Sequence, residues 1–244
     1  MNIAWGITGA GALLRESVET LLSLSARGHR ITAFVSRAGE KVLEAYGLKK
    51  KLEEALRGPY PVGVVYESLE PPGYPTTGRL YLGVYSLVVV APATLNTASK
   101  ILHGVADALV PNLAIHAVKA RIPVYILPVD LYEVKSYIPV VIDRSKCAQC
   151  TTCSAARACP TGALAEHAYY KVVVDASRCT RCHECLKACP HGAIEFDVEV
   201  VVKPVSYYAE LLRRLELIPC VKIIESPSKL VGIIEEAEAG PCNG

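Results

Sequence analysis

The sequence predicts an α/β protein in which a parallel sheet lies between two layers of helices and a smaller α+β module is inserted into the chain. Two patterns indicate this architecture. From Asn2 to Pro128, short apolar strands alternate with amphipathic helices, which is typical of a parallel sheet covered on both faces. After Pro128 this alternation stops, and eight of the ten cysteines follow between Cys147 and Cys189.

The alternating part predicts a Rossmann or flavodoxin-like order of elements. Strands are expected near Asn2–Thr8, Arg30–Ser36, Val62–Tyr66, Leu87–Ala91 and Val124–Pro128. Helices are expected between them, near Leu13–Arg27, Gly39–Ala55, Asn96–His103 and Ala108–Lys119. Prolines between Pro59 and Pro75 predict a long irregular connection before the fourth strand.

Three parts of the chain are predicted from these patterns. Residues 1–138 form the sheet domain, 139–199 the cysteine-rich module and 200–244 a carboxyl-terminal segment. In the last part a helix is expected over Tyr207–Leu217, a strand over Val221–Ile224 and a helix over Ser228–Glu238. Because this segment is too short to bury a core of its own, we expect it to pack back on the sheet domain.

Composition argues against several classes of function. Hydrophobic residues make up 51% of the chain and charged residues 20%, the net charge is +2, and no basic block suggests a nucleic-acid partner. No apolar run approaches the roughly 18–20 residues needed to cross a bilayer, and the first residues lack the features of a secretory signal. A cytoplasmic protein with no membrane partner is expected, and in a reducing compartment its cysteines indicate metal or redox chemistry.

The second half of the cysteine-rich stretch has the spacing of bacterial ferredoxins. Cys179, Cys182, Cys185 and Cys189 follow the pattern C-x2-C-x2-C-x3-C, and Pro190 comes next. In this arrangement three thiolates bind one 4Fe-4S cluster and the fourth binds the other. Two 4Fe-4S clusters with crossed ligands are therefore predicted. Cluster 1 is assigned to Cys147, Cys150, Cys153 and Cys189, and cluster 2 to Cys179, Cys182, Cys185 and Cys159.

The first half departs from that pattern, because five residues instead of three separate Cys153 from Cys159. The two extra residues are expected to loop out. Zinc is the alternative metal, since C-x2-C pairs also suit tetrahedral zinc, although triplets followed by Cys-Pro do not fit the habit of zinc sites. The other two cysteines, Cys220 and Cys242, are given no role, and Cys220 is expected to be a small buried hydrophobe.

A glycine-rich turn from Gly6 to Gly11 joins the first strand to the first helix. Glycines let backbone amides approach an anion at the positive end of a helix. The order is not the dinucleotide pattern G-x-G-x-x-G, and Ser36 and Arg37 stand where a ribose-binding acid would be expected. A terminal phosphate therefore fits this turn better than a ribose, and a plain glycine-rich turn is the alternative.

The segment Ala91-Pro92-Ala93-Thr94-Leu95-Asn96-Thr97 follows the fourth strand. It resembles the Pro-Ala-(Ser/Thr)-x-Asn-Thr signature of the flavoprotein family that includes phosphopantothenoylcysteine decarboxylase and the flavin prenyltransferases. Within that family the chain resembles the archaeal iron-sulfur flavoproteins of the dihydromethanopterin reductase (acceptor) type. The resemblance implies an FMN cofactor bound near Gly9, Ala10, Gly11, Ser36, Ala93, Thr94, Asn96 and Thr97. For Thr94, Asn96 and Thr97, capping of the following helix is the alternative.

The resemblance also implies a function. An oxidoreductase would pass electrons from a donor such as a soluble ferredoxin through the clusters to FMN and on to a pterin-type acceptor, dihydromethanopterin or dihydrofolate. Decarboxylation is disfavoured, because a chain with no methionine beyond Met1 lacks the Pro-x-Met-Asn-x-x-Met motif of the decarboxylases. A non-catalytic electron carrier and a flavin-modifying transferase are the alternatives. Relatives imply a homo-oligomer built from trimers, and no catalytic acid or base is assigned.

Overall fold

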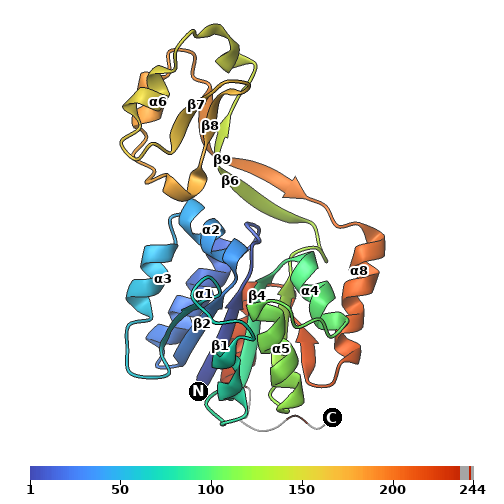
Figure 1. Cartoon of the computed structure of the whole chain (residues 1–244). Coiled ribbons are helices and arrows are strands. Elements are labelled where there is room, and N and C mark those ends of the chain that lie inside the picture. The colour runs from blue at the N-terminus through green and yellow to red at the C-terminus, as the bar shows by residue number, and fades with distance from the viewer. Residues whose placement is uncertain (237–241, 243–244) are drawn as a thin grey trace.

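The computed structural model, which describes residues 1–236 and 242, contains a six-stranded parallel sheet in the order β10-β5-β4-β1-β2-β3 (Figure 1). The strands are β1 (Asn2–Ile7), β2 (Arg30–Val35), β3 (Gly63–Tyr66), β4 (Leu87–Ala93), β5 (Val124–Pro128) and β10 (Val221–Ile223). β4 pairs with β1 on the side opposite to β2, so the winding of the chain reverses between them. This arrangement confirms the predicted α/β class and places the carboxyl ends of β1 and β4 side by side.

Helices cover both faces of this sheet. They are α1 (Leu14–Ala26), α2 (Arg37–Ala45), α3 (Lys49–Ala55), α4 (Leu95–Leu102), α5 (Leu109–Lys119), α8 (Ser206–Arg213) and α9 (Pro227–Glu236), with short 3-10 helices η1 (Pro75–Leu80) and η4 (Arg214–Leu217). Alternate strand residues point to opposite faces. Accordingly, Ile3 and Trp5 of β1 join the buried cluster under α1, α3 and α9, whereas Ala4 joins the one under α4, α5 and α8.

One predicted helix, Gly39–Ala55, is two helices in the structure. α2 ends before Gly47 and α3 begins after it. Gly47 has a φ of +70°, in the left-handed region that glycine adopts without strain. Lys49 then pairs with Glu40 at 2.8 Å and Glu44 at 2.9 Å, which holds the two helices together. The apolar spacing continues across this turn and therefore did not reveal the break.

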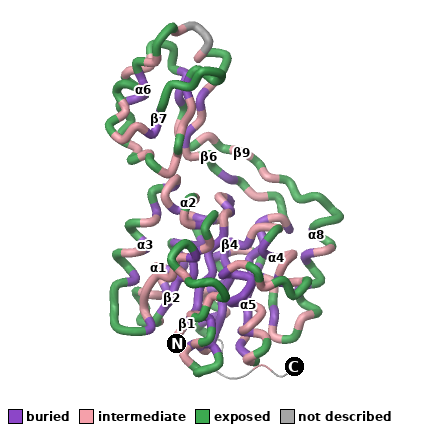
Figure 2. The backbone as a smooth tube through the Cα atoms, in the orientation of Figure 1, coloured by how far each residue is buried: buried purple, intermediate pink, exposed green. Residues whose placement is uncertain are grey.

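The cysteine-rich module stands on a two-stranded antiparallel ribbon formed by β6 (Val134–Ile142) and β9 (Ile194–Val202) (Figure 1). Its other elements are η2 (Lys146–Gln149), α6 (Ser154–Ala158), β7 (Leu164–His167), β8 (Lys171–Val174), η3 (Ala176–Arg178) and α7 (Glu184–Ala188). Burial is concentrated in the sheet domain, and the module has only a small core (Figure 2). The predicted boundaries at residues 138 and 199 fall inside β6 and β9, because each of these strands runs through both units.

The carboxyl-terminal segment lies against the sheet domain. β10 pairs in parallel with β5, α8 packs against α4, and α9 packs against α1. The predicted end of the last helix, at Glu238, lies outside the described residues. In the part of the chain that the structure describes, no helix is both long and apolar enough to cross a membrane.

Cys220 and Cys242 form a disulfide, so the expectation that Cys220 is a small buried hydrophobe is wrong. Cys220 is half-buried just before β10, and its Cα lies 5.6 Å from that of Cys242. The backbone amide of Cys242 donates to the carbonyl of Arg121 at 3.1 Å. The sequence showed two cysteines outside the ferredoxin spacing, but local patterns do not reveal that the fold brings them together.

Replacing Cys220 by serine is expected to lower the free energy of unfolding by about 3 kcal/mol, because the disulfide links residues 22 positions apart. Equilibrium denaturation of the oxidised protein measures this change. The Cys242→Ser variant should lose the same amount, and the reduced wild type should behave like both variants. Equal stability of oxidised wild type and the two variants would contradict a stabilising disulfide.

Candidate functional site

The residues predicted to bind FMN meet at one edge of the sheet, where β2, β1 and β4 end side by side. Gly9–Gly11 follow β1, Ser36 follows β2, and Ala93–Thr97 join the end of β4 to the start of α4. All three loops therefore lie at the carboxyl edge, next to the point where the winding reverses. We call this region the flavin edge.

Thr8 ties two of these loops together. Its hydroxyl donates to the carbonyl of Pro92 at 2.7 Å and accepts from the amide of Thr94 at 3.0 Å. The side chain is almost fully buried. Sequence reasoning did not single out Thr8, although a polar residue that ends a buried strand directly before a glycine turn was an available signal.

Gly9 and Gly11 occupy positions where a side chain would collide with α2 or the turn that follows it. A Cβ on Gly9 would lie 2.6 Å from the Cβ of Ala38, in the first turn of α2. A Cβ on Gly11 would lie 3.0 Å from Cζ of Tyr46 and closer still to its hydroxyl. The glycine turn therefore lies directly against α2, next to the Ser36 loop.

Two of the residues predicted to bind FMN cap the helices that follow them. Ser36 Oγ accepts from the amide of Gly39 at 3.0 Å, and Thr94 Oγ1 accepts from the amide of Thr97 at 3.3 Å. The capping alternative is thus confirmed for Thr94, while Asn96 is exposed. α1 starts at the same edge, where the described residues provide no side-chain cap. Three helix amino termini therefore converge there, and their partial positive charge suits an anion.

Asp130 is a partly buried carboxylate at the end of β5, beside the flavin edge. Its Oδ2 accepts from the amide of Leu95, at the start of α4, at 3.0 Å. Burial raises the pKa of Asp130 above its ordinary value of 3.8 and outweighs this hydrogen bond, which acts in the opposite direction. Sequence reasoning assigned Asp130 no role, although its position after an apolar strand was an available signal.

The Asp130→Asn variant is expected to melt roughly 1–4 °C higher than wild type at pH 7. The side-chain oxygen of asparagine can still accept the hydrogen bond from the backbone amide of Leu95. The substitution also removes a negative charge whose burial costs free energy. Below pH 3.8 the carboxyl is protonated in both the folded and unfolded states, so the difference vanishes there and grows as pH rises through the raised pKa. Thermal unfolding across this range measures the effect, and a difference that widens toward acid would contradict it.

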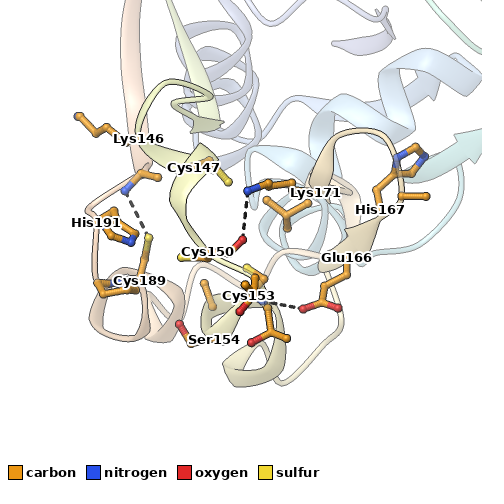
Figure 3. A pocket seen from close by; sticks show the side chains of 17 residues that line it. Lys146, Cys147, Cys150, Cys153, Ser154, Glu166, His167, Lys171, Cys189 and His191 are labelled. Carbon is orange, nitrogen blue, oxygen red and sulfur yellow. Dashed lines mark hydrogen bonds between the residues drawn. The ribbon is translucent and has the colours of Figure 1, made fainter.

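The eight cysteines of the module are free and line two cavities. The first cavity is lined by Cys147, Cys150, Cys153 and Cys189 (Figure 3). The second cavity is lined by Cys159, Cys179, Cys182 and Cys185. Each cavity thus combines the first three cysteines of one half with the last cysteine of the other, which is the grouping that crossed ligation requires.

Backbone amides donate to two thiols of the first cavity. The amide of Ala156 donates to Cys153 Sγ at 3.4 Å. The amide of Ala193 donates to Cys189 Sγ, also at 3.4 Å (Figure 3). Such N–H···S bonds favour the thiolate form and tune the reduction potential of a bound cluster.

The thiols differ in how readily they ionise. Burial raises the pKa of Cys185 in the second cavity and that of Cys147 in the first. Burial acts on Cys159 in the same direction, but hydrogen bonds from the backbone of Leu164 and from Thr161 outweigh it and lower the pKa of that thiol. Metal binding requires thiolates, so Cys159 is the best prepared of these three.

The two extra residues of the first half do not loop out as expected, because they lie in a helix. α6 ends directly before Cys159, and α7, also of five residues, ends directly before Cys189. The two halves differ at the start of the helix, since Cys153 precedes α6 as its cap whereas Cys185 lies inside α7. The last cysteine of each half therefore keeps the same position after its helix.

The spacing of the thiols differs from that of a single-metal site. Among residues 1–236 and 242, no three His, Cys, Asp or Glu side chains come close enough to share one metal ion. Zinc holds thiolates at about 2.3 Å, so four of them must converge on one point. A four-iron cluster binds its thiolates at separate irons, so they stand farther apart. Four thiols around each cavity form the donor set that a four-iron cluster uses.

Comparisons with known proteins cover both parts of the chain. The model of the Flavoprotein family matches residues 1–136, and that of the 4Fe-4S binding domain matches residues 172–195. Dihydromethanopterin reductase (acceptor) of Methanosarcina mazei is 38% identical over 237 residues, which are 94% of this chain and 97% of that protein. This chain belongs to the same flavoprotein family. The predicted resemblance is thereby confirmed, and so is the class of iron-sulfur flavoprotein oxidoreductase.

Two further relatives extend the comparison. A dihydromethanopterin reductase (acceptor) from Methanocaldococcus jannaschii is 40% identical over 168 residues, 67% of this chain and 68% of that protein. DmrB of Burkholderia xenovorans, crystallised in complex with FMN and described as a cubic protein cage for redox transfer, has a TM-score of 0.62 at 23% identity. That similarity covers 96% of this iron-sulfur flavoprotein and 93% of DmrB, and it shows a shared fold along nearly the whole chain.

Proposed function

We propose that this iron-sulfur flavoprotein takes electrons from a donor, passes them through two 4Fe-4S clusters to FMN, and reduces a dihydropterin such as dihydromethanopterin or dihydrofolate. One observation carries the proposal: a module with two four-cysteine cavities stands beside the edge of a flavoprotein-family sheet. The names of the two archaeal relatives support the pterin-type acceptor.

Each cavity would hold one 4Fe-4S cluster. The first cavity would bind cluster 1 and the second cavity cluster 2, with the ligands predicted from the sequence. The family match over residues 172–195 supports one cluster, and the internal duplication, with helices that end at equivalent cysteines, supports the other. The clusters supply one-electron transfer when bound.

FMN would bind at the flavin edge. The convergence of three helix amino termini supports a phosphate near Gly9–Gly11 and Ser36. Thr94, Asn96 and Thr97 lie on the other side of the glycine turn and would contact the phosphate or the isoalloxazine ring. When bound, FMN connects one-electron transfer from the clusters to two-electron reduction of an organic acceptor.

Anaerobic purification followed by reoxidation tests this proposal. We expect about eight iron atoms and about one flavin per chain, and we expect the reduced protein to be reoxidised by dihydromethanopterin or dihydrofolate with formation of the tetrahydropterin. Stoichiometric zinc or colourless protein would contradict the proposed cofactors. Reoxidation by a partner protein but by neither pterin would favour the electron carrier, and a flavin of altered mass after incubation with prenyl phosphates would favour the transferase.

We further propose a cytoplasmic homo-oligomer, built from trimers, with a soluble ferredoxin as donor. Eight free thiols in one module are typical of proteins of a reducing compartment. Exposed tyrosines on the ribbon and at the start of α8 support contact between subunits, with 37% of Tyr137, 70% of Tyr207 and 41% of Tyr208 exposed. Light scattering of the purified protein measures the assembly, and a monomer at all concentrations would contradict it.

A further inference from the structure

The two cavities differ in how they face the sheet domain. η3, which directly precedes Cys179 of the second cavity, packs against α2 beside the flavin edge (Figure 1). A groove between the two units is lined by Gly11 and Tyr46 from the sheet domain and by Asp175 and Ala176 from the module. The second cavity therefore lies on the side of the module that contacts the sheet domain.

The first cavity lies on the opposite side of the module. The segment that joins β6 to α6, which contributes its first three cysteines, is at the end of the module away from the sheet domain (Figure 1). Residues that line this cavity bind other parts of the module: Lys146 pairs with Glu195 at 3.2 Å, and Ser154 donates to the carbonyl of Ala188 at 2.6 Å.

Asp197 connects the second cavity to the sheet domain. It lies in β9 with a φ of +51°. The pairing of β6 with β9 is interrupted at this point, between the pairs Ile138–Val198 and Val140–Phe196. Its Oδ1 accepts from Arg15 of α1 at 3.0 Å, and its Oδ2 pairs with Arg181, the neighbour of Cys182. One carboxylate thus bridges the helix that follows the glycine turn and the loop that carries a thiol of the second cavity.

Packing holds the same loop in place. The guanidinium of Arg181 lies 5.6 Å from the ring centroid of Phe196, and His183 stacks on that ring at 4.5 Å. Phe196 and His183 both line the second cavity. Cδ of Arg181 also lies 3.7 Å from where a Cβ on Gly47 would be, so the loop rests on the turn between α2 and α3.

Tyr46 completes the contact from the sheet domain. Its hydroxyl donates to the carbonyl of Tyr137 in β6, its ring lies against Gly11, and Arg15 lies 5.4 Å from the ring centroid. Burial raises the pKa of Tyr46, so the hydroxyl keeps its proton and remains a donor. The glycine turn of the flavin edge and the second cavity are therefore joined by consecutive side-chain contacts.

We infer that cluster 2, in the second cavity, is the cluster that exchanges electrons with FMN, and that Asp197 is the positioning residue that holds it near the flavin edge. This inference rests on the proposed function. In this arrangement Cys147, Cys150, Cys153 and Cys189 would hold cluster 1 on the side of the donor, and the four cysteines of the second cavity would hold cluster 2 between cluster 1 and the flavin edge. Each cluster would supply one-electron transfer, so full reduction of FMN would take two electrons from the donor and two protons from solvent. Electron transfer slows steeply with distance, so the contact between the units sets its rate.

The Asp197→Asn variant of the full-length holoprotein tests the inference. Asparagine tolerates the positive φ at this position and removes the charge that both arginines share. Glu199→Gln is the matched control, because Glu199 lies two residues along β9 and pairs with Lys135 inside the ribbon at 2.9 Å. After photochemical reduction of the clusters, we expect flavin reduction to be at least about tenfold slower in Asp197→Asn only, because small misplacements of reacting groups are costly.

Hydrogen exchange of the same samples provides a readout that does not depend on electron transfer. We expect Asp197→Asn to increase exchange over residues 176–183 and 44–47 and to leave residues 146–153 unchanged. Equal flavin-reduction rates and equal exchange in the two variants would overturn the inference, as would an increase confined to residues 146–153. Iron and flavin analysis of the wild type separates this result from failure of the proposed function, which would appear as missing cofactors.

Discussion

Replacing Cys185 by serine is expected to lower the iron content from about eight to about four atoms per chain, because each 4Fe-4S cluster requires four thiolates. Cys185 is the buried member of the second cavity and belongs to the small apolar core of the module. Cluster 2 should be lost, and with it the reduction of flavin through the clusters. Iron and acid-labile sulfide analysis, together with EPR of the reduced protein, measures the change.

Thr180→Ala is the matched control for this substitution. Thr180 lies between Cys179 and Cys182 and lines the same cavity, but its replacement leaves every thiol in place. We expect this variant to keep the wild-type iron content. A Cys185→Ser protein that also kept about eight iron atoms would show that Cys185 is not a cluster ligand.

Replacing Gly9 by alanine is expected to weaken FMN binding by about 10- to 100-fold, since overpacking costs typically 1–3 kcal/mol. The new methyl group would lie 2.6 Å from the Cβ of Ala38, and neither group can rotate away. The glycine turn would have to move away from α2 and from the Ser36 loop. Titration of the flavin-free protein with FMN, followed by flavin fluorescence, measures the loss.

Two further variants distinguish a collision from a general effect of removing a glycine. Gly63 lies in β3, where an added Cβ would meet no heavy atom of the described residues within 4 Å apart from its own chain neighbours, so Gly63→Ala should bind FMN like wild type. The double variant Gly9→Ala with Ala38→Gly removes the facing methyl group and should recover most of the affinity. If the double variant bound FMN as weakly as the single one, the steric explanation would be wrong.

The sheet could be predicted from the sequence because its signals are local. Strands buried on both faces read as short apolar runs, and a glycine-rich turn marks where the first of them ends. The cysteine spacing of the second half follows a known pattern, so the grouping of the eight cysteines around two cavities could be predicted from it. The five-residue gap after Cys153 was harder to interpret, because spacing alone does not show that a helix absorbs the extra residues.

The contacts that join distant segments could not be predicted in this way. Asp197 meets Arg15 across 182 positions of sequence, and Thr8 meets Thr94 across 86. Each of these residues is unremarkable in its own neighbourhood, since a single carboxylate in a strand or a threonine before a turn fits many folds. Their roles depend on which loops the sheet order and the ribbon bring together.

The chain enters the module through β6 and leaves it through β9, and Val134 and Val202 are partners at the base of this ribbon. The chain therefore enters and leaves the module at neighbouring positions. Because β6 and β9 are antiparallel, a short hairpin turn could join them directly. The sheet domain, which keeps its own core and its glycine turn, does not need the intervening residues to complete its strands. One continuous stretch of sequence, from β6 to β9, therefore carries the whole cysteine-rich module, and none of the six strands of the parallel sheet comes from it.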